Sequence, residues 1–134
     1  MKSRLLFSFI AIVLLISCAR DIDTDGGQKT ANAFFKSIIS KDYEKAAKLV
    51  HRDAVFYTKR KEFIKHLGHD EKYGDLKSIG GTMLKAQNVT QTRDYTRWKF
   101  AEKLNYDSLS IIVDLTIVDS GEGPKFYDIK RRYD

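Results

Sequence analysis

The segment 109–118 constrains the fold most, because its side chains alternate without a break between two rows. One row is wholly aliphatic, and the other contains a serine, an aspartate and a threonine. Successive side chains of a β-strand point to opposite faces of the sheet, so a period of two residues predicts a strand with one buried face. The aliphatic row, expected to lie on the core, is Leu109, Ile111, Val113, Leu115 and Ile117.

Three further strands are predicted around this one, at 82–92, 95–106 and 125–133, with the central strand extending over 108–119. Polar turn clusters separate them at 93–94, 107–108 and 120–124. Because short connections join antiparallel neighbours, we expect a four-stranded antiparallel meander. In the second strand the row that faces the core holds Trp98, Phe100, Glu102, Leu104 and Tyr106.

The first part of the domain has the helical period instead. Apolar residues recur every three or four positions from Ala31 to Ile39, and again from Tyr43 to Val50. Asp42 is placed to cap the second helix, and Thr58 to cap a third that ends at Gly68. The predicted fold class is therefore α+β, with N-terminal helices packed on a C-terminal four-stranded meander.

A short apolar leader precedes the domain. Lys2 and Arg4 stand before an apolar run over 5–16, which is too short for a membrane span of about 20 residues and indicates an export signal. An ordinary secretory signal, or a buried N-terminal helix, is the alternative. We expect a signal peptide at 1–17, a flexible tether at 18–29 and one domain at 30–134.

The end of the leader, Leu15-Ile16-Ser17-Cys18, resembles the lipobox of bacterial lipoproteins. The resemblance implies cleavage before Cys18, lipidation of that cysteine with fatty acids such as palmitate, and anchoring in the cell envelope. Two or three acyl chains bind a membrane far more firmly than one. Ala19 follows the cysteine, and the resemblance then favours the outer membrane if the cell is Gram-negative.

Composition limits the function of the exported chain. Its formal charge falls from +6 to +4 when Lys2 and Arg4 leave with the leader, a mild excess that favours anionic surfaces. Cys18 is the only cysteine, so stability depends on an apolar core and no thiol is left for catalysis. A location outside the cytoplasm argues against nucleic acid as a partner, and the sequence predicts no cofactor and no metal.

The order of elements resembles the cystatin-like, nuclear transport factor 2-like cone, particularly small bacterial lipoproteins of uncharacterised function. The resemblance rests on Phe34-Phe35, Asp42-Tyr43, the segment Tyr73-Gly74-Asp75-Leu76-Lys77 and the terminal meander. It implies a curved sheet wrapped against helices, often with a pocket between them and often with a homodimer formed through the sheet. Fold alone does not imply an activity.

Glu102 is the first candidate for chemistry, because alternation places this carboxylate in the row that faces the core. A buried carboxyl can transfer protons, with Tyr43, Tyr57 or Tyr106 as the orienting donor and Trp98 as an apolar wall. The alternative is that a β-bulge or the end of the strand turns Glu102 to solvent.

The second candidate is a binding surface on the opposite row of the same strand. Arg97, Lys99 and Lys103 share that row, with Trp98 between them, and Lys130 and Arg132 are placed to lie alongside. Such a surface would take anionic lipid headgroups, a cell-wall polymer or an acidic protein, whereas a row that only keeps the sheet soluble is the alternative.

Two other chemistries find little support. His66, His69 and Asp70 are close in sequence, but Gly68 interrupts the helix between them and a third strong ligand is missing. The serines, Ser120 among them, lack a nucleophile-elbow motif and a nearby histidine motif. The favoured function is thus a membrane-anchored, non-catalytic ligand- or protein-binding domain. The alternative is a small cone-fold isomerase or hydrolase-like enzyme using Glu102.

Overall fold

The computed structural model describes residues 22–79 and 86–133, in one α+β unit. The leader, Cys18 and the beginning of the predicted strand 82–92 lie outside the described residues. The elements, in chain order, are α2 (Gln28–Ile39), α3 (Tyr43–Ala47), α4 (Arg60–Leu67), the 3-10 helix η1 (Gly68–Tyr73), β1 (Leu76–Ile79), β2 (Asn88–Gln91), β3 (Thr96–Tyr106), β4 (Ser110–Asp119) and β5 (Lys125–Tyr133).

The helices form where the apolar period predicted them, and two of the three expected boundary signals are confirmed. The Asp42 side chain caps α3 by accepting a hydrogen bond from the Lys45 backbone N–H at 3.1 Å. Gly68 is the C-cap of α4, as expected. The prediction for Thr58 is wrong, because Lys59 occupies the N-cap position and makes no side-chain capping bond.

The sheet has five strands, not four, and all of its pairings are antiparallel. The meander β3–β4–β5 is confirmed. The extra strand is β1, in a segment where the sequence predicted no strand. It pairs with residues 104–106 of β3, while β2 pairs with residues 96–99 on the same edge. Two short strands thus supply hydrogen-bond partners for the backbone along one edge of β3.

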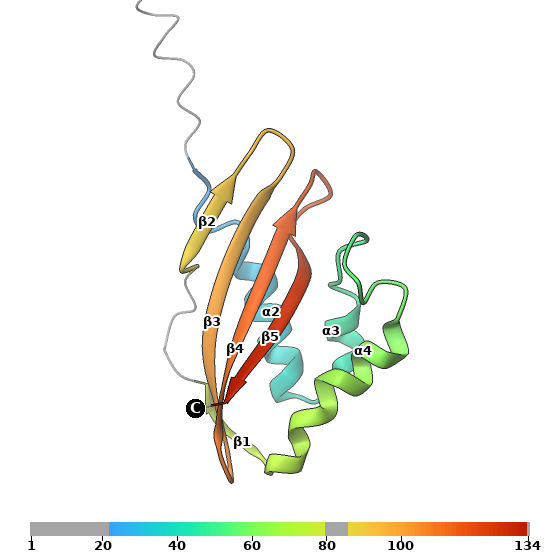
Figure 1. The fold of residues 1–134 in the computed structure, drawn as a ribbon, viewed down its shortest axis with the longest axis vertical. Coiled ribbons are helices and arrows are strands. Elements are labelled where there is room, and N and C mark those ends of the chain that lie inside the picture. The colour runs from blue at the N-terminus through green and yellow to red at the C-terminus, as the bar shows by residue number, and fades with distance from the viewer. Residues whose placement is uncertain (1–21, 80–85, 134) are drawn as a thin grey trace, which may run out of the picture.

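One face of the sheet is covered by helices and the other is open. Figure 1 shows α2 behind β4 and β5, with α3 and α4 beside them, while the near face of the sheet carries no helix. In the core, the Phe34 ring of α2 stacks on Phe126 of β5 with centroids 5.2 Å apart, and Phe63 of α4 meets the same ring at 5.1 Å. The aliphatic row of β4 is buried here, as predicted.

The chain before α2 packs onto the domain through Trp98. The indole Nε1 donates a 2.8 Å hydrogen bond to the Asp23 carbonyl oxygen. A Cβ at Gly27 would stand 2.7 Å from Cδ2 of the same ring, so the close approach requires glycine. Residues 23–27 of the predicted tether therefore pack on the domain, and residues 19–21 lie between Cys18 and the described chain.

Within residues 22–79 and 86–133, no helix is long and apolar enough to cross a membrane. The apolar run of the leader falls outside these ranges.

Candidate functional site

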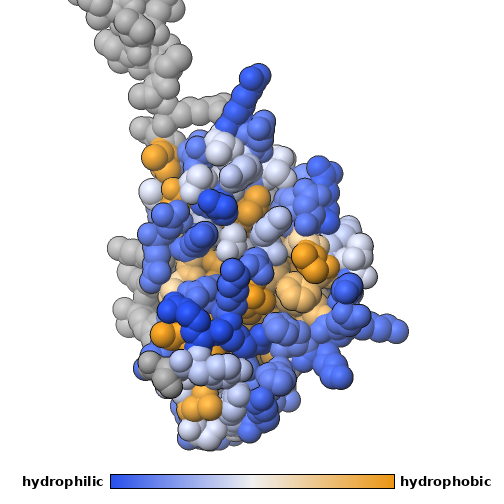
Figure 2. Space-filling model, viewed as in Figure 1, coloured by the Kyte–Doolittle hydropathy of each residue, from blue (hydrophilic) through white to orange (hydrophobic). Residues whose placement is uncertain are grey.

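The open face of the sheet carries two adjoining grooves. The first has a volume of about 490 Å³ and the second about 390 Å³, and Arg97 and Tyr127 line both. Figure 2 shows this face, where hydrophilic side chains cross the sheet and apolar residues are seen in the gaps between them. We call the pair the outer groove. Its other polar lining residues are Gln87, Asn88, Lys99, Asp114, Thr116, Asp128 and Lys130 in the first half, and His51, Asp53, Asp94, Tyr95 and Ser120 in the second.

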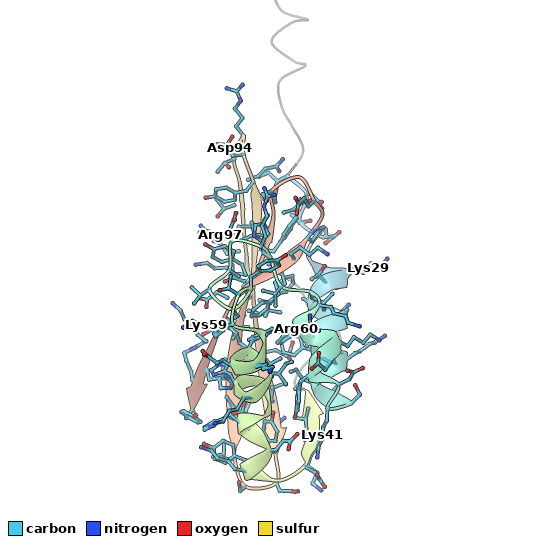
Figure 3. All side chains as sticks on the ribbon, turned by 90° about the vertical axis from the view of Figure 1, so that its right-hand side faces the viewer. Lys29, Lys41, Lys59, Arg60, Asp94 and Arg97 are labelled. Carbon is cyan, nitrogen blue, oxygen red and sulfur yellow. The ribbon has the colours of Figure 1, made fainter. Side chains whose placement is uncertain are left out.

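Arg97 lies where the two halves meet. It is half-buried, its Nη2 is 3.5 Å from the Thr90 hydroxyl, and its guanidinium carbon is 6.0 Å from the centroid of the Tyr95 ring. Its Nε is buried and has no hydrogen-bond partner in the described chain. Figure 3 shows Arg97 on the side of the sheet away from Lys29 and Lys41 of the helical layer.

The first half of the groove has an excess of positive charge. The strand register places Lys99 of β3 opposite Thr116 of β4, and Thr116 opposite Asp128 of β5. Lys99 and Asp128 therefore lie on either side of Thr116. Asp114 is neutralised by Arg132, whose Nε and Nη2 donate to its two carboxylate oxygens at 2.6 and 2.9 Å. Lys99 and Lys130 therefore add their positive charges to that of Arg97. Asp128 is the remaining negative charge among the residues that line this half.

The second half contains a histidine and a serine that sequence reasoning did not connect. His51 is 3% exposed, and its Nε2 lies 2.8 Å from the Ser120 Oγ. The Asp53 backbone N–H donates to His51 Nδ1 at 3.1 Å, so Nδ1 carries a lone pair and Nε2 carries the proton. His51 then donates to Ser120 and has no lone pair on Nε2 to accept the serine proton. The pair is a hydrogen-bonded support, not an activated nucleophile.

The fold, not a local motif, brings these two residues together. His51 N donates to the Phe126 carbonyl, and a parallel bridge joins Val50 to Phe126, which fixes the segment after α3 beside the β4–β5 turn. A register shift between Thr116 and Ile117 forms a bulge in β5, and both Tyr127 and Asp128 then line the groove. Neither feature has a sequence signal at short range.

The structure places two residues of the predicted basic surface, Arg97 and Lys99, in the outer groove. Lys103 lies farther along β3, opposite Ile112. Trp98 does not belong to this surface, because it is 1% exposed on the helical side. The physical reason is the period of two: neighbours of Arg97 and Lys99 on the strand must face the other way.

Glu102 lies on the helical side of β3 and is 7% exposed, as its place in the alternation predicts. Burial raises the pKa of its carboxyl. The expected partners are elsewhere: Tyr57 is exposed, and Tyr106 and Trp98 are each four residues away along the strand, about 13 Å at 3.3 Å per residue.

Tyr43 and Tyr106 instead line a separate cavity of about 240 Å³ with Glu71. The Tyr43 hydroxyl donates to Glu71 Oε1 at 2.6 Å. Burial, followed by that bond, raises the pKa of Tyr43, and burial near Asp70 raises the pKa of Tyr106 to about 12. Both hydroxyls thus stay protonated at neutral pH.

A second cavity on the helical side is much smaller. A cavity of only about 10 Å³ lies among Phe34, Leu67, Asp70, Val113 and Arg131. Its volume is that of roughly one water molecule, far below the roughly 300 Å³ of a ligand pocket, and Glu102 is not among the residues lining it.

His66, His69 and Asp70 are engaged by cations. Arg131 donates to Asp70 Oδ2, to the His66 carbonyl and to His66 Nε2, and Lys72 donates to His69 Nε2 at 2.8 Å. The lone pairs that a metal would need face positive charge, and within the described ranges no group of three or more ligating side chains meets.

Comparison with known proteins supports the fold alone. No family model matches the chain, and no curated protein matches its sequence. A solved structure titled "Structure of Bdellovibrio bacteriovorus Bd1075" matches 79% of this chain with a TM-score of 0.51 and 13% identity. The present chain spans 38% of the length of that protein chain.

Proposed function

We propose that this chain is an envelope lipoprotein whose domain is non-catalytic and binds an anionic ligand in the outer groove. The observation that carries the proposal is Arg97, a half-buried guanidinium that lines both halves of the groove. Lys99 and Lys130 add charge to the same half. Electrostatic attraction of this kind increases the rate and the selectivity of binding.

Glu102 lines neither of the two cavities described on the helical side, which favours the outer groove over the alternative enzyme. A proton-transfer site at Glu102 needs a pocket for substrate and a tyrosine within hydrogen-bond reach. The core cavity is about 10 Å³, and Tyr43 is bonded to Glu71 instead. The outer groove, in contrast, is open to solvent over both halves and accessible to a large ligand.

The proposal also includes a cone-like fold for the domain and a lipid anchor at Cys18. Helices against one face of a twisted antiparallel sheet, in this element order, support a cystatin-like or nuclear transport factor 2-like cone. Lipidation of Cys18, and an outer-membrane location in a Gram-negative cell, rest on the leader sequence. A Cys18→Ser chain that still fractionated with membranes and still incorporated labelled palmitate would remove the anchor from the proposal.

The groove is tested by charge reversal against a matched control. The variant is Arg97→Glu with Lys99→Glu. The control is Lys29→Glu with Lys61→Glu, which changes the net charge equally at exposed first-turn helix positions where an acidic residue is favourable. The full chain is titrated with polygalacturonate and with polyphosphate at 0.15 M salt, where distant surface charges are screened.

We expect the groove variant to lose about tenfold or more in affinity, about 1.4 kcal/mol, and the control to lose less than about twofold. Equal losses in the two variants would show that net charge alone attracts the probes. Full retention of affinity by the groove variant would exclude the groove.

A further inference from the structure

We propose that the ligand of the outer groove is an acidic glycan, with sugar hydroxyls in the half around His51 and Ser120 and an acid substituent in the half around Lys99 and Lys130. The inference rests on the proposed function, because it names the class of ligand for the same groove. It is carried by the uneven distribution of charge along the groove.

The cationic half suits a carboxylate or an ester of phosphate or sulfate. Arg97 lines this half, and Lys99 and Lys130 approach from β3 and β5. Gln87 and Asn88 stand at the rim of the same half. Their amide groups both donate and accept hydrogen bonds, as hydroxyls of a sugar require.

The other half has the opposite character. Asp53 and Asp94 line it, and Asp128 stands in the neighbouring half. An acidic peptide or a layer of anionic lipid headgroups would meet these carboxylates along the groove and be repelled by them. A sugar hydroxyl, in contrast, donates to a carboxylate through a charge-assisted hydrogen bond. Figure 3 shows Asp94 near the end of the β2–β3 hairpin, on the same side of the sheet as Arg97.

The His51–Ser120 pair adds a directed donor to this half. His51 Nδ1 accepts a hydrogen bond from the Asp53 backbone N–H, so the imidazole proton is on Nε2. This Nε2–H donates to the Ser120 Oγ. The serine hydroxyl is then left to donate its own proton to a ligand oxygen. Ser120 is exposed and lines the groove, and its hydroxyl is oriented by the hydrogen bond from the buried His51.

Aromatic rings mark the junction of the two halves. Tyr127, which lines both, is 40% exposed and is held edge-on against the buried His51 with ring centroids 5.9 Å apart. Tyr95 lines the second half next to Arg97. Such side chains offer an apolar ring body and a polar tip to the alternating C–H and hydroxyl surface of a sugar.

The test uses a change whose sign depends on the class of ligand. Asp53→Asn and Asp94→Asn, both in the half assigned to sugar hydroxyls, each remove one negative charge and keep an oxygen acceptor in place. For an acidic glycan, losing the charge-assisted bond to a hydroxyl weakens binding. For an acidic peptide or an anionic membrane, losing a repulsive charge strengthens it. The full chain and both variants are titrated with oligogalacturonate, its methyl ester, polyglutamate and vesicles of phosphatidylglycerol with phosphatidylcholine.

We expect oligogalacturonate to bind at least tenfold more tightly than the methyl ester, polyglutamate and the vesicles. We expect each asparagine variant to weaken oligogalacturonate binding threefold to tenfold, and Ser120→Ala to weaken it by a similar factor. Unchanged urea midpoints of the variants confirm that the fold is intact.

Tighter binding of polyglutamate or of the vesicles than of oligogalacturonate, with a further gain in the asparagine variants, would overturn the glycan and leave the anionic groove in place. Loss of the dependence on Arg97 and Lys99 for every probe would overturn the proposed function itself.

Discussion

Arg131 and Asp70 form a buried ion pair that joins the last strand to the turn after α4. Arg131 Nε donates to Asp70 Oδ2 at 2.6 Å, and the two side chains are 10% and 4% exposed. Arg131 is on the inward row of β5, directly across β4 from Glu102 through Val113. The C-terminal strand is thus joined to the helical layer by the polar contacts of Arg131 with Asp70 and His66, inside an apolar interface.

Removing one partner of this pair should cost far more than removing both. Arg131→Met leaves the Asp70 carboxylate buried without its cation, and we expect a loss of about 3–5 kcal/mol in the free energy of unfolding. The double variant Asp70→Leu with Arg131→Met should regain most of that loss. Urea titration of the full chain measures both.

Arg132→Met is the control, because it breaks the exposed pair with Asp114 and should cost no more than about 1 kcal/mol. A double variant as unstable as Arg131→Met would contradict the prediction and assign the loss to packing of the arginine stem.

Acidification should destabilise the same corner through His66. Partial burial is the largest cause that lowers the pKa of His66, and the Arg131 guanidinium is the second. The Asp70 carboxylate raises this pKa, and His69 lowers it further. The unfolded chain therefore binds this proton more readily than the folded chain. The stabilising contribution is present above the ordinary histidine pKa of about 6.5 and is lost as pH falls through the lowered value.

We expect the free energy of unfolding to fall between pH 7.5 and 5, and the slope assigned to His66 to be at most about 1.4 kcal/mol per pH unit. His66→Gln, which keeps an acceptor for Arg131, should reduce that slope. NMR titration of the His66 ring checks the cause, and a midpoint above 6.5 would refute it.

Glu102→Gln should stabilise the domain at neutral pH. Burial raises the carboxyl pKa, so the folded chain holds the proton more tightly than the unfolded chain. The protonated Glu102 carboxyl therefore contributes to the free energy of unfolding at acid pH. This contribution is lost as the pH rises through the raised pKa. Glutamine has no charge to bury, so the variant should unfold at higher urea than the parent at pH 7, and the two should converge near pH 4. A loss of stability at pH 7 would show that the ionised carboxylate is favourably bound.

The sequence predicted those parts of the fold that depend on local periodicity. The alternation of 109–118 identified β4 and its buried row, and the three-to-four spacing of Ala31, Phe34, Phe35 and Ile38 identified the buried face of α2. It missed β1, because a strand of four residues carries too weak a pattern. Their pairing is decided by the free edge of β3.

The candidate site was predictable only in part. Arg97 and Lys99 were found because charge on alternate residues of a strand must share a face. His51, Ser120 and Tyr127 were not, since they come from three segments that meet through the Val50–Phe126 bridge and the β5 bulge. Trp98 was placed on the wrong side as a surface residue, although its own strand period already pointed inward.

The sequence by itself determined where the helices lie and which face of the central strand is apolar. Each of these depends on residues within a few positions of one another. The tertiary structure alone decided that Asp70 meets Arg131, that His51 holds Ser120, and that the polar face of the sheet is hollowed into a groove. Such contacts join segments 61 to 69 residues apart, and their geometry is set by packing and strand register, which no local pattern encodes.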